Sequence, residues 1–110
     1  MTSPREGERM FWELADEFMK NPAITEGKIM SSRCLRANGE FVAMVAYKSQ
    51  QLVVKLTKKE VDRLIGEGVG LPFAPAKKVF KEWVEIKDYD RVLWRRLIAD
   101  AIASQRRVDK

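Results

Sequence analysis

Few residues in this chain of 110 could do chemistry, because it has no histidine and a single cysteine, Cys34. It also has no glycine-rich phosphate-binding loop. Acid–base catalysis near neutral pH would need a carboxylate, lysine, tyrosine or cysteine with a shifted pKa. Cys34 lies in a strand-like pattern and is interpreted as a small core residue. Glu82 beside Trp83 is interpreted as ordinary strand alternation.

The same residue content limits metal binding and the cellular compartment. Zinc sites built from Cys and His at regular spacing are excluded. We therefore predict a non-enzymatic protein with no catalytic residue, no metal and no cofactor. Cys34 cannot form an intrachain disulfide, which is consistent with a reducing compartment. No apolar run approaches the roughly 20 residues of a membrane-spanning helix. A cytoplasmic protein that does not bind membranes is expected.

Positive charge suggests nucleic acid as one class of partner. The net charge is +5, although residues 1–26 carry 3 basic and 6 acidic side chains, so the excess lies further along. Basic side chains can release counterions from a phosphate backbone. Single-strand binders, however, interleave aromatic residues with basic ones, and here the aromatics fall mainly on predicted core faces. This hypothesis expects weak, salt-sensitive, sequence-tolerant binding by Lys58, Lys59, Arg63, Arg91, Arg95 and Arg96.

A second hypothesis is protein interaction, through either an unidentified partner or self-association. The lack of catalytic residues favours it. Binding would use a sheet face or the loop Gly68–Pro75, and aromatic side chains are frequent anchors of such interfaces. The predicted contacts are Trp12, Phe73 and Trp83.

The first element is predicted to be a helix that begins at the capping box Ser3–Glu6 and stops at Asn21–Pro22. Trp12 falls to the side of its apolar face and is interpreted as the edge of the core. The apolar face is formed by Met10, Phe11, Leu14, Ala15 and Phe18.

A three-strand meander is predicted next. The strand Ile29–Arg36 and the strand Phe41–Tyr47 flank Asn38-Gly39, a dipeptide typical of two-residue hairpins. Phe41–Tyr47 is apolar on both faces, which favours a central strand with helices on one face and a partner or curled sheet on the other. Alternation over Leu52–Leu56 predicts the third strand.

The remaining pattern predicts a helix, a loop, a strand and a helix. Thr57–Glu60 is a second capping box, followed by a short helix that ends near Gly66. Gly70–Pro75 is predicted to be a loop whose Phe73 enters the core. Val79–Ile86 is predicted to be the fourth strand. Asp88 or Asp90 is expected to cap the last helix, whose apolar face includes Leu93, Trp94, Leu97, Ile98, Ala101 and Ile102.

The chain is therefore predicted to form one α+β domain over residues 1–110. We expect two layers, an antiparallel sheet backed by helices, in the order α-β-β-β-α-β-α. A chain of this length can bury one core but not two.

From about Phe11 to Ile102 the sequence resembles the TfoX N-terminal domain family. The resemblance lies in a small-residue first strand with a cysteine (SSRCL, 31–35), a "FAM"-like strand (FVAM, 41–44) and a "VKL" strand (VVKL, 53–56). It continues with a G-x-P-F loop (GLPF, 70–73) and a K-E-W-V strand (81–84). Ser31-Ser32 departs from the Phe-Gly that many relatives carry after the methionine.

This resemblance implies a two-layer α+β domain, similar to YjbR-like proteins, in a bacterial cytoplasmic protein. TfoX proteins are competence regulators, so it also implies a regulatory module. The family motif defines no catalytic residues to carry over.

Overall fold

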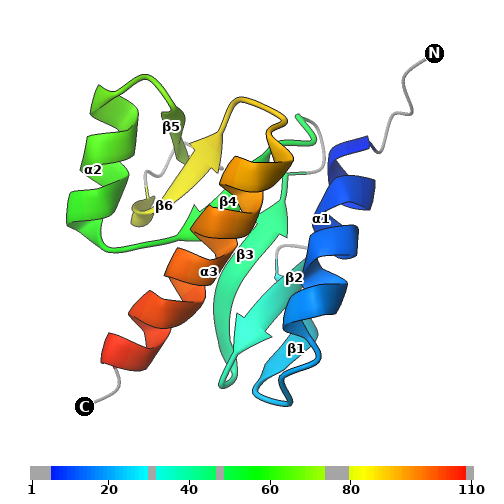
Figure 1. The fold of residues 1–110 in the computed structure, drawn as a ribbon. Coiled ribbons are helices and arrows are strands. Elements are labelled where there is room, and N and C mark those ends of the chain that lie inside the picture. Colours follow the sequence, from blue (N-terminus) through cyan, green and yellow to red (C-terminus); the bar gives the residue numbers. More distant parts are fainter. Residues whose placement is uncertain (1–5, 30–31, 47–48, 74–79, 109–110) are drawn as a thin grey trace.

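The computed structural model describes residues 6–29, 32–46, 49–73 and 80–108. All six strands join one antiparallel sheet in the order β1-β2-β3-β4-β6-β5. Three helices lie over one face of it (Figure 1). The elements are α1 (Glu6–Phe18), β1 (Ile24–Ile29), β2 (Ser32–Ala37), β3 (Glu40–Val45), β4 (Leu52–Lys55), α2 (Lys58–Gly66), β5 (Gly70–Phe73), β6 (Phe80–Ile86) and α3 (Arg91–Val108).

The predicted fold class is confirmed: an α+β domain with an antiparallel sheet backed by helices. The sheet has six strands where the sequence pattern predicted four. The predicted strand Ile29–Arg36 corresponds to β2, whereas β1, which ends at Ile29 and pairs antiparallel with β2, was not predicted. β1 is an edge strand whose sequence, ITEGKI, places charged residues and a glycine between its isoleucines. Such a strand lacks the apolar alternation that sequence analysis detects.

β5 is the second strand that the pattern missed, since Gly70–Phe73 was predicted to be a loop. Pro72 argued against a strand there because proline cannot donate to a ladder. In the structure β5 is the other edge of the sheet, where proline is tolerated. The predicted burial of Phe73 is confirmed, at 6% exposed. Ala74–Val79, Ser3–Arg5 and Tyr47 of the predicted elements lie outside the described residues.

Local signals set the turn between β2 and β3 and the starts of α2 and α3 as predicted. Asn38 and Gly39 both have positive φ angles, 54° and 84°, as a two-residue hairpin requires. The hydroxyl of Thr57 accepts the amide of Glu60 at 3.2 Å and caps α2. Asp90 caps α3, because its carboxylate accepts the amide of Leu93 at 3.1 Å.

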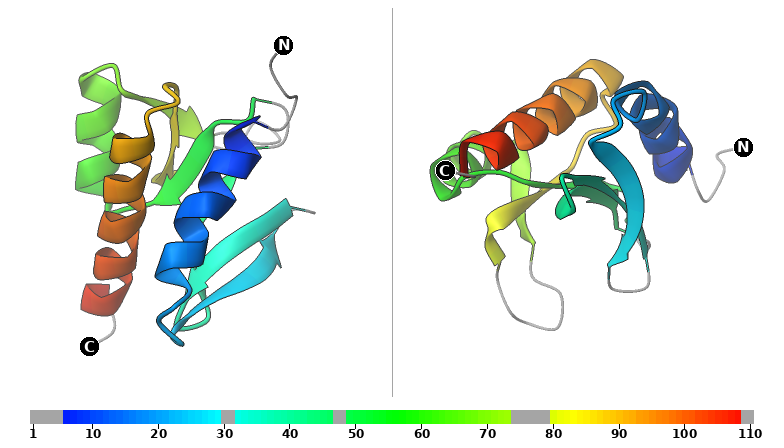
Figure 2. Two further views of the ribbon diagram at one scale, coloured as in Figure 1. Left: turned by 45° about the vertical axis from the view of Figure 1, so that its right-hand side comes forward. Right: turned by 90° about the horizontal axis from the view of Figure 1, so that it is seen from below.

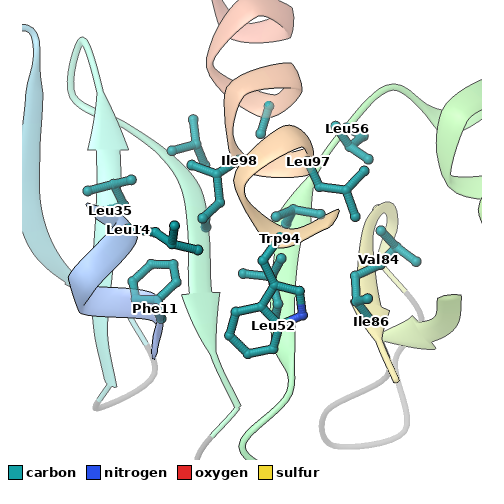
Figure 3. Close-up of a cluster of buried hydrophobic side chains, with 14 of the residues drawn as sticks. Phe11, Leu14, Leu35, Leu52, Leu56, Val84, Ile86, Trp94, Leu97 and Ile98 are labelled. Carbon is teal, nitrogen blue, oxygen red and sulfur yellow. The ribbon is translucent and has the colours of Figure 1, made fainter. Parts of the chain in front are cut away.

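Helices and sheet meet in a continuous core on the helix side of the sheet (Figure 3). Trp94 of α3 is fully buried in it, and its indole N–H donates to the carbonyl of Asp88 at 2.8 Å. Burying a side chain of this size contributes on the order of 2–3 kcal/mol. The core also holds Phe11, Leu14, Leu35, Leu52, Leu56, Val84, Ile86, Leu97 and Ile98.

A second, smaller cluster lies on the face away from the helices. The sheet curves so that this face is concave (Figure 2). The predicted two-sided burial of β3 is therefore confirmed, and of the two covers expected for the side without helices, a partner or a curled sheet, the structure has the curled sheet. Five buried side chains make up this concave cluster: Cys34, Phe41, Met44, Val53 and Phe73.

The start of α1 is fixed against the turn between β3 and β4. Gln50 in this turn is buried and adopts a positive φ of 58°. Its side-chain oxygen accepts the amide of Glu8 at 3.0 Å, which satisfies one of the free N–H groups at the helix start. Gly7 makes the contact possible, because a Cβ there would lie 1.9 Å from the carbonyl oxygen of Gln50.

We expect Gly7→Ala to destabilise the protein by about 1–3 kcal/mol, because the added methyl group forces α1 away from the turn. Chemical denaturation measures the change. Gly66→Ala is the matched control: it also lies in a helix, a Cβ there meets nothing within 4 Å, and alanine favours helix by up to about 1 kcal/mol. Equal effects of the two substitutions would contradict the docking of α1 described above.

Candidate interaction site

Trp83 of β6 lies at the edge of the concave cluster and is half-buried. Its ring packs on Phe41 of β3, with ring centroids 4.5 Å apart, and on Phe73 of β5, at 5.4 Å. Two of the three aromatic residues predicted as contacts, Phe73 and Trp83, are therefore neighbours. The neighbouring rings fix the position of the Trp83 side chain.

A hollow of about 380 Å³ opens beside Trp83. It is lined by Lys55, Lys81 and Glu82 in addition to the indole. Lys55 of β4 lies directly opposite Trp83 in the strand register. Neither lysine forms an ion pair within the described part of the chain. The hollow thus combines an aromatic surface with two cations, which suits an apolar group next to a negative one.

Trp12, the third predicted contact, lies elsewhere. It belongs to α1 and is half-buried against the helix-side core, as predicted for a residue at the core edge. The ring of Phe11 meets its ring edge-on, and the Arg33 guanidinium lies 4.2 Å from its ring centroid. A cation in this position already occupies the indole face. The structure does not bring Trp12 together with Phe73 and Trp83.

The six basic residues predicted to contact nucleic acid lie on α2 and α3, and most of them are paired with a carboxylate. Two of them join α3 to α1: Arg91 pairs with Glu13 at 2.7 Å, and Arg95 pairs with Glu17. All four side chains are exposed, so each pair contributes little to stability. The pairs do place a carboxylate beside each of these arginines.

The basic residues of α2 are also paired. Lys58 contacts Asp62 at 3.1 Å. Arg63 contacts Glu60 at 2.6 Å and Glu67 at 3.1 Å. The hydrogen bond from Arg63 lowers the pKa of the Glu60 carboxyl below its usual value.

Arg63 and Arg96 meet in a hollow of about 210 Å³ between α2 and α3. Glu60 and Asp100 line the same hollow, so its charges are mixed. Of the six predicted residues, only Lys59 and Arg96 lack an ion pair within the described ranges.

Cys34 is fully buried in the concave cluster, which confirms its interpretation as a core residue. Burial raises the pKa of its thiol, and the nearby Arg36 guanidinium acts more weakly in the opposite direction. A buried thiol of raised pKa is a poor nucleophile. Among the described residues, no group of His, Cys, Asp or Glu side chains could hold a metal ion. No helix in the described ranges is long and apolar enough to cross a membrane.

Sequence analysis missed Lys55, Lys81 and Phe41 as neighbours of Trp83. A signal for one of them was present, because Lys81 and Trp83 are two residues apart in a strand and so share a face. The positions of Lys55 and Phe41 depend on the register and order of β3, β4 and β6, which no local pattern specifies.

Comparisons with known proteins found no match for this chain among family models, curated proteins or solved structures. The resemblance to TfoX N-terminal domains stays a prediction from the residues.

The raised pKa of Cys34 predicts a pH dependence of stability. Because the folded state disfavours the thiolate, the unfolded chain releases this proton at a lower pH. The thiol's contribution to stability is complete below its ordinary pKa of about 8.5 and is lost as the pH rises above it. Denaturant unfolding from about pH 7 to 10 should show a steeper loss for the wild type than for Cys34→Ala. Parallel curves would contradict the burial of the thiol.

Proposed function

We propose that this protein is a non-enzymatic interaction module that binds a segment of a partner protein in the hollow beside Trp83. One observation carries the proposal: a half-buried indole, supported by Phe41 and Phe73, lines a hollow together with Lys55 and Lys81. Tryptophan is among the residues that contribute most to protein interfaces. An indole already held by its neighbours loses little conformational entropy on binding.

The charges around the hollow define the chemistry of the partner segment. Lys55 and Lys81 form no ion pair within the described residues, and Glu82 is the only carboxylate among the residues that line the hollow. A partner aspartate or glutamate would supply the missing negative charge, while an apolar side chain next to it covers the indole. Complementary charge increases the rate and specificity of association more than its affinity. We therefore expect the segment to combine an apolar residue with a neighbouring acidic one.

A regulatory role, which the resemblance to TfoX implies, would act through this partner. A cytoplasmic location is part of the same proposal, since Cys34 is a free thiol. Nucleic acid is the less favoured partner, because Lys58, Arg63, Arg91 and Arg95 each face a carboxylate. Those carboxylates lower the positive potential that would attract a phosphate backbone.

Selection of a random displayed peptide library on the immobilised protein tests the proposal. We expect enriched peptides to carry an apolar side chain beside Asp or Glu. On titration with such a peptide, the NMR signal of the Trp83 indole N–H should shift. Trp83→Ala should weaken binding by at least about tenfold, as for a central interface anchor.

Two further variants separate loss of the site from loss of the fold. Lys55→Glu leaves the aromatic packing intact and should also weaken binding, because it repels the acidic residue. Trp12→Ala is the matched aromatic control and should bind normally. Peptides without acidic residues, or equal binding by all variants, would overturn the proposal. Binding of labelled DNA that is abolished by Lys59→Ala with Arg96→Ala, without any enriched peptide, would favour the nucleic-acid alternative.

A further inference from the structure

β1 is one edge of the sheet. The hydrogen bonds between β1 and β2 determine which of its backbone N–H and C=O groups point away from β2. The carbonyl of Ala23 accepts the amide of Asn38 at 2.9 Å, which makes this a hydrogen-bonded pair. Bonding alternates along an antiparallel ladder, so Thr25 and Gly27 also bond to β2. Glu26 and Lys28 therefore direct their backbone N–H and C=O groups to the free edge. They point toward the side on which another strand could pair, and one of them, the Lys28 carbonyl, also accepts a long hydrogen bond from Arg36.

Lys28 faces a like charge in the isolated chain. In the β1–β2 register it lies directly opposite Arg33, a like charge. Like charges in this position are destabilising. Lys28 forms no ion pair within the described ranges, whereas Arg33 pairs with Glu26 at 2.6 Å. The lysine thus lacks the carboxylate that its neighbour has.

We propose that a second copy of this chain pairs with β1 in antiparallel orientation, about a twofold axis at Gly27. In this register the twofold axis creates two equivalent pairs, and in each pair Glu26 of one copy lies opposite Lys28 of the other. Each of these residues directs its backbone groups to the edge, so both pairs are hydrogen-bonded pairs. Both side chains lie on the same face of the sheet, because residues two apart in a strand share a face. The lysine that faces Arg33 within its own chain gains a carboxylate.

The neighbouring register is disfavoured by charge. An axis at Glu26 also joins outward-directed groups, but it places Glu26 opposite Glu26 of the second copy. Lysine in an edge strand ordinarily discourages strand addition. In the register with its axis at Gly27, the same lysine faces a glutamate and therefore favours pairing with a second copy of β1 over pairing with other strands. The β5 edge is the weaker alternative, because Pro72 supplies no N–H group.

Arg36 and Gly27 are consistent with this arrangement. The Arg36 side chain crosses β1 directly over Gly27, where a Cβ would lie 2.4 Å from its Nε. Its guanidinium reaches the carbonyl of Lys28 at 3.5 Å, the limit of a hydrogen bond. A carbonyl has two lone pairs, so this oxygen can still accept an amide from a second strand.

Light scattering and amide hydrogen exchange over a wide range of protein concentration test the proposal. We expect the mass to rise from monomer to dimer with concentration. The amides of Glu26 and Lys28 should become protected as the dimer forms, while the amide of Gly27 is protected throughout. A monomer at every concentration, or a dimer in which the Glu26 and Lys28 amides stay unprotected, would overturn it.

Charge variants give a second test that does not depend on loss of folding. Lys28→Glu removes the repulsion from Arg33 within the chain, so the monomer should be at least as stable, yet association should weaken roughly tenfold. Combining it with Glu26→Lys should restore association, since opposite charges face each other again. Lys59→Glu makes the same charge change on α2, far from β1 (Figure 1), and should leave the dimer unaffected. Unchanged association of Lys28→Glu would exclude this register. The hollow at Trp83 plays no part in either outcome.

Discussion

The arrangement of the whole domain depends on one constraint: β3 and β4 are apolar on both faces, while helices cover one. Val42 and Val54 are fully buried in the helix-side core, and Val53 is fully buried on the opposite face. Leaving that second face in water would expose a continuous apolar surface. The sheet covers it by curling, so that β2 supplies Cys34 and β5 supplies Phe73 (Figure 2). The curvature of the sheet therefore follows from the apolar residues on both faces of β3 and β4.

The same constraint explains where the candidate site lies. A curled sheet of six strands is too small to bury its whole concave face. Side chains of the middle strands are fully buried there, whereas burial is incomplete toward one side of the sheet. Val53 is fully buried, whereas Trp83 on neighbouring β6 is half-buried beside a hollow. Lys55 and Lys81 line this hollow. The proposed binding surface is thus the incompletely buried margin of the concave cluster, where an aromatic ring is held by its neighbours.

Sequence analysis identified what is encoded locally. The Asn38-Gly39 turn, the Thr57 cap and the apolar face of α3 each depend on residues a few positions apart, and all three were predicted correctly. The edge strands β1 and β5 were not predicted. An edge strand buries few of its side chains, and its conformation depends more on pairing with the neighbouring strand than on its own composition. The grouping of Phe73 with Trp83 and Lys55 arises from the order β4-β6-β5, which no local pattern contains.

The basic residues differ in whether they have a carboxylate partner within the chain. Glu13 and Glu17 of α1 lie against Arg91 and Arg95 of α3, so the basic residues on this helical face are neutralised within the chain. Lys55, Lys81 and Lys28 form no such pair within the described residues, and all three lie on strands. Exposed ion pairs contribute little to folding, so the lack of a partner costs these lysines little stability. Under the proposed function, an acidic protein segment supplies the negative charge at the sheet, while the helical layer carries charges of both signs.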